Sequence, residues 1–204
     1  TMDCDVSTDE GRLTAAMSSG CVVVVDPLVP AGREKIKAHD LEAWTVCFDT
    51  HQPHLLHSGG DDARWRGWDL RCPSSQPAFT NAWHSAGVCS IQPHPRNPLL
   101  IATGSYDKRI ALWDRRQLRR PMKTLDPAAA SGVWKLRWHP RQDEKLLVAC
   151  MYDGFYVYKV PTLTMVQESP SSGPVAVCVK FDPQALSYGC AWLDDYTAVS
   201  CSFY

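Results

Sequence analysis

The feature that most constrains this chain is a repeat of about 45 residues, because a period of that length means that one structural unit recurs along the sequence. Trp68, Trp113 and Tyr158 stand 45 residues apart. An aspartate precedes each of these aromatic residues by five or six positions. A similar arrangement of small and apolar residues fits residues 16–24, upstream of the first Trp-Asp pair. The chain is therefore expected to be an array of similar units.

Each repeat has the pattern of several short strands. Its opening residues alternate between apolar and other types, as in Trp44, Val46 and Phe48, and such alternation is typical of a half-buried strand. Turns rich in proline and histidine follow, and no stretch has the spacing of a long amphipathic helix. We therefore predict an all-β fold. A period of about 45 with a Trp-Asp ending is typical of a WD-repeat β-propeller.

The repeat also predicts the blade boundaries. At about 45 residues per blade, 204 residues supply about 4.5 blades of an incomplete propeller. We expect residues 1–26 to be the end of one blade and residues 174–204 to be an incomplete last blade. Between them we expect three full blades, at residues 39–83, 84–126 and 130–167.

Two blades have the residues for a buried chain of hydrogen bonds. His39 precedes Asp62, and His84 precedes Asp107, by 23 residues in each case, while a hydroxyl residue stands ten positions before each Trp. In WD repeats these positions link the indole, hydroxyl, imidazole and carboxylate groups. The four expected members are Trp68, Ser58, His39 and Asp62 in one blade, and Trp113, Thr103, His84 and Asp107 in the next.

An oriented His–Asp pair could also serve as a general base. The structural role is the stronger interpretation, because the same spacing recurs in two blades and catalysis rarely needs duplicates. The following blade breaks the pattern, with Ala129 and Ala130 in place of the histidine and Tyr158 in place of the tryptophan. We expect that blade to be held by packing.

Composition excludes several classes of function. With 21 Lys and Arg against 22 Asp and Glu, the formal net charge is −1, so no nucleic-acid partner is expected. The longest apolar run has seven residues, at 146–152, against the ~20 that a membrane helix needs, so no membrane association is expected. The nine cysteines never occur as Cys-x-x-Cys, which favours reduced thiols and a cytoplasmic location.

Two other clusters of like residues could form functional sites, but a structural role is the stronger interpretation of each. His51, His54 and His57 have a metal-like spacing, but alternation along a strand would scatter them over both faces, so no metal site is expected. Arg115, Arg116, Arg119 and Arg120 form a basic run that we interpret as a solvated edge, since no aromatic platform is interleaved with it. No cofactor is expected.

Several motifs carry a more specific resemblance, and they cover residues 39–158 densely and both ends thinly. They are AHDLEAW at 38–44, SGGDD at 58–62, RGWD at 66–69, GVCSI at 87–91, ATGSYD at 102–107, GVW at 132–134, WHP at 138–140 and CSFY at 201–204. Together they closely resemble the WD-repeat diphthine methyl ester hydrolases of diphthamide biosynthesis.

The resemblance implies hydrolysis of the methyl ester of diphthine methyl ester on elongation factor 2, which would be the protein partner. It supplies no catalytic residues. Diphthine carries a trimethylammonium group, and such a cation favours aromatic faces. The expected substrate-binding candidates are Glu42, Asp61, Tyr106, Trp134 and Tyr152. Because the chain lacks a Gly-x-Ser-x-Gly elbow, the alternative is a non-catalytic WD-repeat scaffold that docks elongation factor 2 or pathway enzymes.

Overall fold

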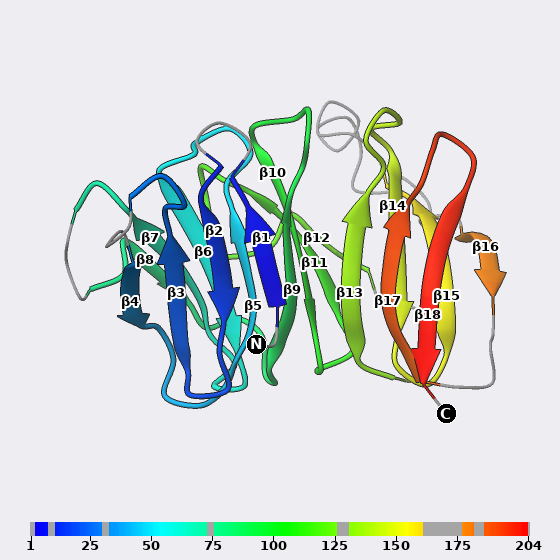
Figure 1. Cartoon of the computed structure of the whole chain (residues 1–204). Coiled ribbons are helices and arrows are strands. Elements are labelled where there is room, and N and C mark those ends of the chain that lie inside the picture. Colours follow the sequence, from blue (N-terminus) through cyan, green and yellow to red (C-terminus); the bar gives the residue numbers. More distant parts are fainter. Residues whose placement is uncertain are drawn as a thin grey trace.

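The chain folds into antiparallel β-sheets that succeed one another along the sequence (Figure 1). The computed structural model describes residues 3–7, 11–29, 33–72, 76–125, 131–160, 177–181 and 186–203, and only the backbone of residues 177–181 and 203. Every regular element in these ranges is a strand. Among them there is accordingly no helix long and apolar enough to cross a membrane. The predicted all-β class is confirmed.

Four sheets have four strands each and the fifth has two; we number them as blades in chain order. The first blade contains β1 (Asp3–Val6), β2 (Leu13–Ala16), β3 (Cys21–Val25) and β4 (Arg33–Lys37). The second contains β5 (Ala43–Phe48), β6 (Leu55–Gly60), β7 (Trp65–Asp69) and β8 (Phe79–Asn81). The third contains β9 (Val88–Pro93), β10 (Leu100–Ser105), β11 (Ile110–Asp114) and β12 (Lys123–Leu125).

The fourth blade contains β13 (Val133–Trp138), β14 (Lys145–Cys150), β15 (Gly154–Lys159) and β16 (Val177–Phe181). The fifth consists of β17 (Leu186–Trp192) and β18 (Ala198–Phe203). The first strand of each blade contacts the first strand of the next, so β1, β5, β9, β13 and β17 form the inner layer of the array. This arrangement of radially repeated sheets is that of a β-propeller.

Buried apolar side chains join neighbouring blades. Leu112 of the third blade and Leu136 and Val148 of the fourth belong to one buried cluster. The backbones come close there, because a Cβ added to Gly104 would lie 2.6 Å from Cγ1 of Val133. Glycine at this position therefore allows adjacent sheets to pack face to face.

The tight turn between the second and third strands recurs in the same form. The residue after the turn aspartate has a positive φ in three blades: Ala63 (57°), Lys108 (71°) and Gly154 (88°). Left-handed backbone of this kind is easy for glycine and strained for other residues. Two of the three turns therefore depend on other interactions to hold a non-glycine residue in that conformation.

Two expected blade boundaries differ from the structure. Residues 1–26 were expected to be the end of a blade, but β1 and β4 make the first blade four-stranded from residue 3 to residue 37. Residues 174–204 were expected to form the incomplete last blade, whereas Val177–Phe181 pairs with β15 as the outer strand of the fourth blade. Alternation is similar in inner and outer strands, so the pattern alone could not distinguish them. Residues 161–176 and 182–185 lie outside the described part.

Candidate functional site

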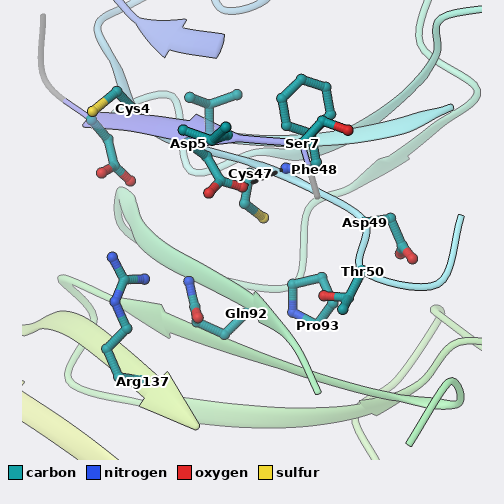
Figure 2. A pocket seen from close by; sticks show the side chains of 13 residues that line it. Cys4, Asp5, Ser7, Cys47, Phe48, Asp49, Thr50, Gln92, Pro93 and Arg137 are labelled. Atoms are coloured by element: carbon teal, nitrogen blue, oxygen red, sulfur yellow. Dashed lines mark hydrogen bonds between the residues drawn. The ribbon is translucent and has the colours of Figure 1, made fainter. Parts of the chain in front are cut away.

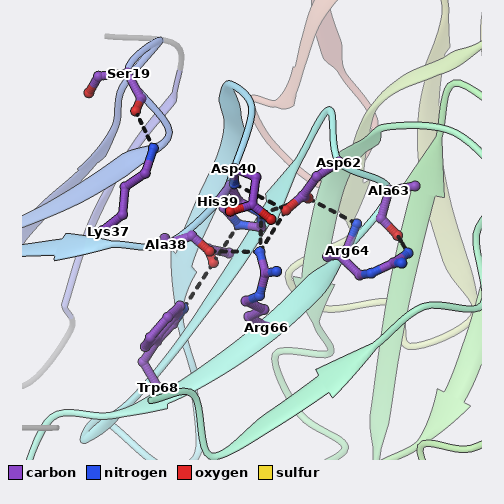
Figure 3. Close-up of polar contacts among 11 residues, drawn as sticks. Ser19, Lys37, Ala38, His39, Asp40, Asp62, Ala63, Arg64, Arg66 and Trp68 are labelled. Carbon is purple, nitrogen blue, oxygen red and sulfur yellow. Dashed lines mark hydrogen bonds and ion pairs between the residues drawn. The ribbon is translucent and has the colours of Figure 1, made fainter. Parts of the chain in front are cut away.

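The second blade contains a continuous chain of hydrogen bonds (Figure 3). Trp68 Nε1 donates to Ser58 Oγ at 2.9 Å, and Ser58 Oγ lies 2.8 Å from His39 Nε2. His39 Nδ1 lies 2.8 Å from Asp62 Oδ1. Since the ionised carboxylate can only accept, the imidazole donates from Nδ1 to Asp62, and Nε2 of the neutral ring accepts the hydroxyl proton. The imidazole of His39 is therefore occupied on both sides.

The third blade repeats this chain with threonine in place of serine. Trp113 Nε1 donates to Thr103 Oγ1 at 2.8 Å, which lies 2.8 Å from His84 Nε2. His84 Nδ1 lies 2.9 Å from Asp107 Oδ2. His84 is 4% exposed and His39 is 2% exposed. Two buried imidazoles with both nitrogens engaged are placed to stabilise the blades, and neither faces solvent as a general base would need to.

The two turn carboxylates are held in the charged form. Burial alone would raise the pKa of Asp62, but hydrogen bonds from His39 and Arg66 hold that pKa well below its ordinary value. Arg66 Nη1 lies 2.7 Å from Asp62 Oδ2 and also donates to the carbonyl of Ala38. The pKa of Asp107 is likewise lowered, against the effect of burial, by His84 and by two backbone N–H groups. Both carboxylates therefore contribute to folding stability at neutral pH.

A second buried His–Asp pair lies at the opposite end of the second blade, and the sequence patterns did not indicate it. His57 Nε2 lies 3.0 Å from Asp49 Oδ2, and Trp65 Nε1 donates to His57 Nδ1 at 3.3 Å. Arg115, from the third blade, forms an ion pair with Asp49. These contacts hold the pKa of Asp49 well below its ordinary value although burial opposes them.

The members of the basic run therefore have different environments in the structure, and so do the members of the histidine triplet. Arg115 has a side chain only 14% exposed and is part of an inter-blade ion pair, so its interpretation as a solvated residue was wrong. Arg116, Arg119 and Arg120 are exposed as expected. His51 Nε2 lies 2.9 Å from the carbonyl of His94, while His57 pairs with Asp49. Within the described ranges no three His, Cys, Asp or Glu side chains are grouped as metal ligands.

The substrate-binding candidates gather at the end of the array where the inner strands begin, which is at the bottom of the view in Figure 1. We call this end the upper rim. There the turns between second and third strands meet the starts of the inner strands. Asp61 N–H donates to the carbonyl of Glu42 at 2.9 Å, and Tyr106 N–H donates to that of Gly87 at 2.9 Å. Equivalent turns of two successive blades therefore lie at the same level.

Four aromatic side chains from four blades form a continuous group on the upper rim. We call Trp44, Tyr106, Trp134 and Tyr188 the aromatic cluster. The ring centroid of Trp44 lies 6.3 Å from that of Tyr106 and 5.8 Å from that of Trp134. Trp134 in turn lies 5.1 Å from Tyr188 in an edge-to-face arrangement. A Cβ at Gly87 would overlap the Trp44 ring, so glycine there lets the indole reach across the third blade.

The remaining candidates differ in how they lie relative to the aromatic cluster. Glu42 Oε2 accepts a hydrogen bond from Trp44 Nε1 at 3.2 Å, which places a carboxylate directly beside the aromatic cluster. Asp61 is exposed next to Glu42. Tyr152 lies in the corresponding turn of the fourth blade, between β14 and β15, and is 67% exposed. Trp44 and Tyr188 were not among the expected site residues; the position of Trp44 at the start of an inner strand was the available signal.

Comparisons with known proteins agree with this architecture. A family model described as "WD domain, G-beta repeat" matches residues 75–114. The chain is 40% identical over 156 residues to a human protein named diphthine methyltransferase, covering 76% of this chain and 33% of that protein. The chain is 30% identical over 204 residues to the Schizosaccharomyces pombe protein named diphthine methyltransferase, and the match covers 98% of this chain and 60% of that protein. It is 34% identical over 194 residues to the Saccharomyces cerevisiae protein of the same name, and that match covers 83% of this chain and 48% of that protein.

These names correct one expectation and support a coarser one. The relatives are named as methyltransferases, which contradicts the expected methyl ester hydrolase and its class as a carboxylic-ester hydrolase. The chain spans between about a third and three fifths of the length of these relatives. The chain has the all-β architecture of a propeller, contains a matching WD repeat, and is similar to proteins named for a methyl transfer involving diphthine.

Proposed function

We propose that this chain is part of a protein that acts on diphthine in the reaction class for which its relatives are named. The observation that carries the proposal is the 40% identity over 156 residues to the human diphthine methyltransferase. The matched length is most of this chain, so the likeness extends well beyond a single repeat. Elongation factor 2 is the proposed protein partner and the cytoplasm the proposed location. None of the eight cysteines with described side chains is in a disulfide, which supports a reducing compartment.

In this proposal the upper rim binds the diphthine side chain through its trimethylammonium group. Quaternary ammonium ions bind to aromatic faces, with about 0.5–2 kcal/mol for each good contact. Tyr106 is 45% exposed and Tyr152 is 67% exposed, so both present ring surface to a ligand. Glu42, beside Trp44, adds a negative charge where the cation would sit. The rim therefore supplies both attractions that such a cation requires.

The role of the rim in methyl transfer would be to position the acceptor. Holding a reacting group in a defined orientation lowers the entropic part of the barrier. When the ammonium group is bound, the rest of the diphthine side chain acts as a short tether, which restricts where the acceptor atom can lie. Residues that bind the ammonium are thus expected to affect substrate affinity more than the chemical step.

The test uses the complete protein that contains this chain, with elongation factor 2 bearing diphthine as substrate and the methyl donor supplied. Intact mass should show the gain of a methyl group. Replacing Tyr106 or Trp134 by leucine should raise KM by about 2- to 30-fold, as loss of one cation–π contact predicts. Tyr196→Leu is the matched control, because Tyr196 is 91% exposed and lies between β17 and β18. An unchanged KM in both rim variants would contradict the rim assignment, and no mass gain would contradict the reaction class.

A further inference from the structure

A second candidate site lies between the inner strands, away from the aromatic cluster. It is a pocket of about 280 Å³ lined by residues of β1, β5, β9 and β13 and by the turn after β5. We call it the channel pocket. Its lining residues that matter here are Asp5, Phe48, Thr50, Gln92 and Arg137 (Figure 2). At β5 it adjoins Val46–Thr50, whereas Trp44, at the start of the same strand, belongs to the upper rim.

Most charged groups around the channel pocket are already paired. Asp3 accepts a hydrogen bond from Thr45 Oγ1 at 2.8 Å and forms an ion pair with Lys135 Nζ at 2.8 Å. Asp49 is paired with His57 and Arg115. These carboxylates have their partners within the protein, so they are not available to a ligand.

Asp5 and Arg137 are different. Asp5 Oδ2 accepts a hydrogen bond from the backbone N–H of Phe48 at 2.9 Å, and it forms no ion pair within the described part of the chain. Burial raises the pKa of Asp5, although the positive charge of Arg137 opposes this effect. The guanidinium of Arg137 has no hydrogen-bond partner among the described residues. In Figure 2 the two side chains face the same space from different strands.

Opposite charges held apart across a cavity match a ligand that carries both charges. A guanidinium binds a carboxylate through two parallel hydrogen bonds, and a carboxylate binds an ammonium group. The pocket volume of about 280 Å³ lies just below the usual range for ligand sites, which starts at about 300 Å³, so the ligand must be small. Both requirements are met by a free α-amino acid.

We propose that the channel pocket binds a small α-amino-acid zwitterion, with its carboxylate on Arg137 and its ammonium group on Asp5. Gln92 and Thr50 line the same pocket and supply further polar atoms. This site is independent of the proposed action on diphthine, because it shares no residue with the aromatic cluster or with Glu42 and Asp61.

The test is isothermal titration of the complete protein with glycine, alanine and methionine, and with acetate and methylammonium as the two halves of the zwitterion. At least one amino acid should bind ten times more tightly than either half. Arg137→Gln and Asp5→Asn should each weaken that binding at least tenfold. Arg141→Gln is the control, since the Arg141 side chain is 75% exposed and pairs with Asp195 outside the pocket.

Either of two results would overturn the assignment. One is that no amino acid binds more tightly than acetate and methylammonium to the unsubstituted protein. The other is that Arg137→Gln and Asp5→Asn bind the amino acid as well as the control does. Thermal unfolding of each variant is measured alongside; if a variant does not fold, the comparison of whole and half ligands decides. Loss of methyl transfer to diphthine is a separate readout and bears only on the function proposed for the rim.

Discussion

The third and fourth blades build the same turn by different means. In the third, Asp107 lies at the end of a buried hydrogen-bonded chain and also accepts bonds from the backbone N–H groups of Ser85 and Arg109. In the fourth, one oxygen of Asp153 is buried without a partner. The polar chain is absent there because Val148 occupies the position of the hydroxyl residue Thr103.

The residue that follows the aspartate differs accordingly. The third blade places Lys108 at φ 71°, a conformation that costs roughly 1–2 kcal/mol for a residue with a side chain. The fourth places Gly154 at φ 88°, where no such cost applies. Its buried Tyr158 stacks against Tyr156 at 5.9 Å. A polar network can thus offset local strain, whereas a blade without the network uses glycine and apolar packing.

The largest effect is expected from removing the shared hydroxyl of the third blade. Thr103→Val leaves Nε2 of His84 and Nε1 of Trp113 without partners, and each buried polar group left unpaired costs about 1–3 kcal/mol. We expect the free energy of unfolding in urea to fall by roughly 2–5 kcal/mol. The reverse change, Val148→Thr, should destabilise less, because it buries a single unpartnered hydroxyl. Equal losses would show that the network contributes nothing specific.

Removing the turn carboxylates should give a smaller and unequal effect. Asp107→Ala should lower the free energy of unfolding by about 1–3 kcal/mol, since it leaves the buried Nδ1 of His84 unpaired, whereas the two exposed backbone N–H groups can bond to water instead. Asp153→Ala should cost less, because an oxygen of Asp153 is already unpartnered. Denaturant titration of both variants measures the difference, and a larger loss for Asp153→Ala would reverse the comparison.

The glycine of the fourth blade provides the next test. Gly154→Ala should destabilise by roughly 1–2 kcal/mol, because alanine is strained at φ 88°. Lys108→Gly should relieve a similar strain in the third blade, offset in part by the greater freedom of glycine in the unfolded chain. Thermal unfolding of the two variants should therefore shift in opposite directions. Shifts in the same direction would argue against strain at Lys108.

The smallest expected effect is on the pH dependence of stability. The pKa of Asp107 in the folded protein is lowered from 3.8, so its contribution is fully present above that value and is lost as the pH falls through the folded pKa. Asp107→Asn should therefore lose less stability than the unsubstituted protein between about pH 5 and pH 2.5. The slopes of the free energy of unfolding against pH should differ by less than the slope for one bound proton, which is about 1.4 kcal/mol per pH unit. Identical slopes would show that Asp107 is not preferentially stabilised in its charged form.

The sequence predicted the parts of the fold that repeat. The spacing of Trp68, Trp113 and Tyr158 led to the propeller class, and the hydrogen bonds around His39 and His84 follow the expected order. It failed for elements without a repeat signature. The charged strand Arg33–Lys37 and the outer strand Val177–Phe181 carry no feature that assigns them to a blade.

The candidate sites were predictable to a lesser degree for the same reason. Tyr106 and Trp134 could be placed on one rim because they occupy repeat positions near each turn. Nothing in the sequence relates Asp5 to Arg137, or Asp49 to Arg115, because these residues approach only when separate blades pack. Contacts between blades depend on three-dimensional curvature, which a period in the sequence does not specify.

The ion pair between Asp3 and Lys135 spans 132 residues and has a consequence for folding during synthesis. Thr45, the other partner of Asp3, follows it by only 42 residues. At about 5–20 residues per second, Lys135 leaves the ribosome roughly 7–26 s after Asp3. During that interval β1 can dock on β5 through Thr45 while its carboxylate lacks its lysine. The first two blades are therefore expected to assemble as an early unit, and the ion pair to close only when the fourth blade arrives.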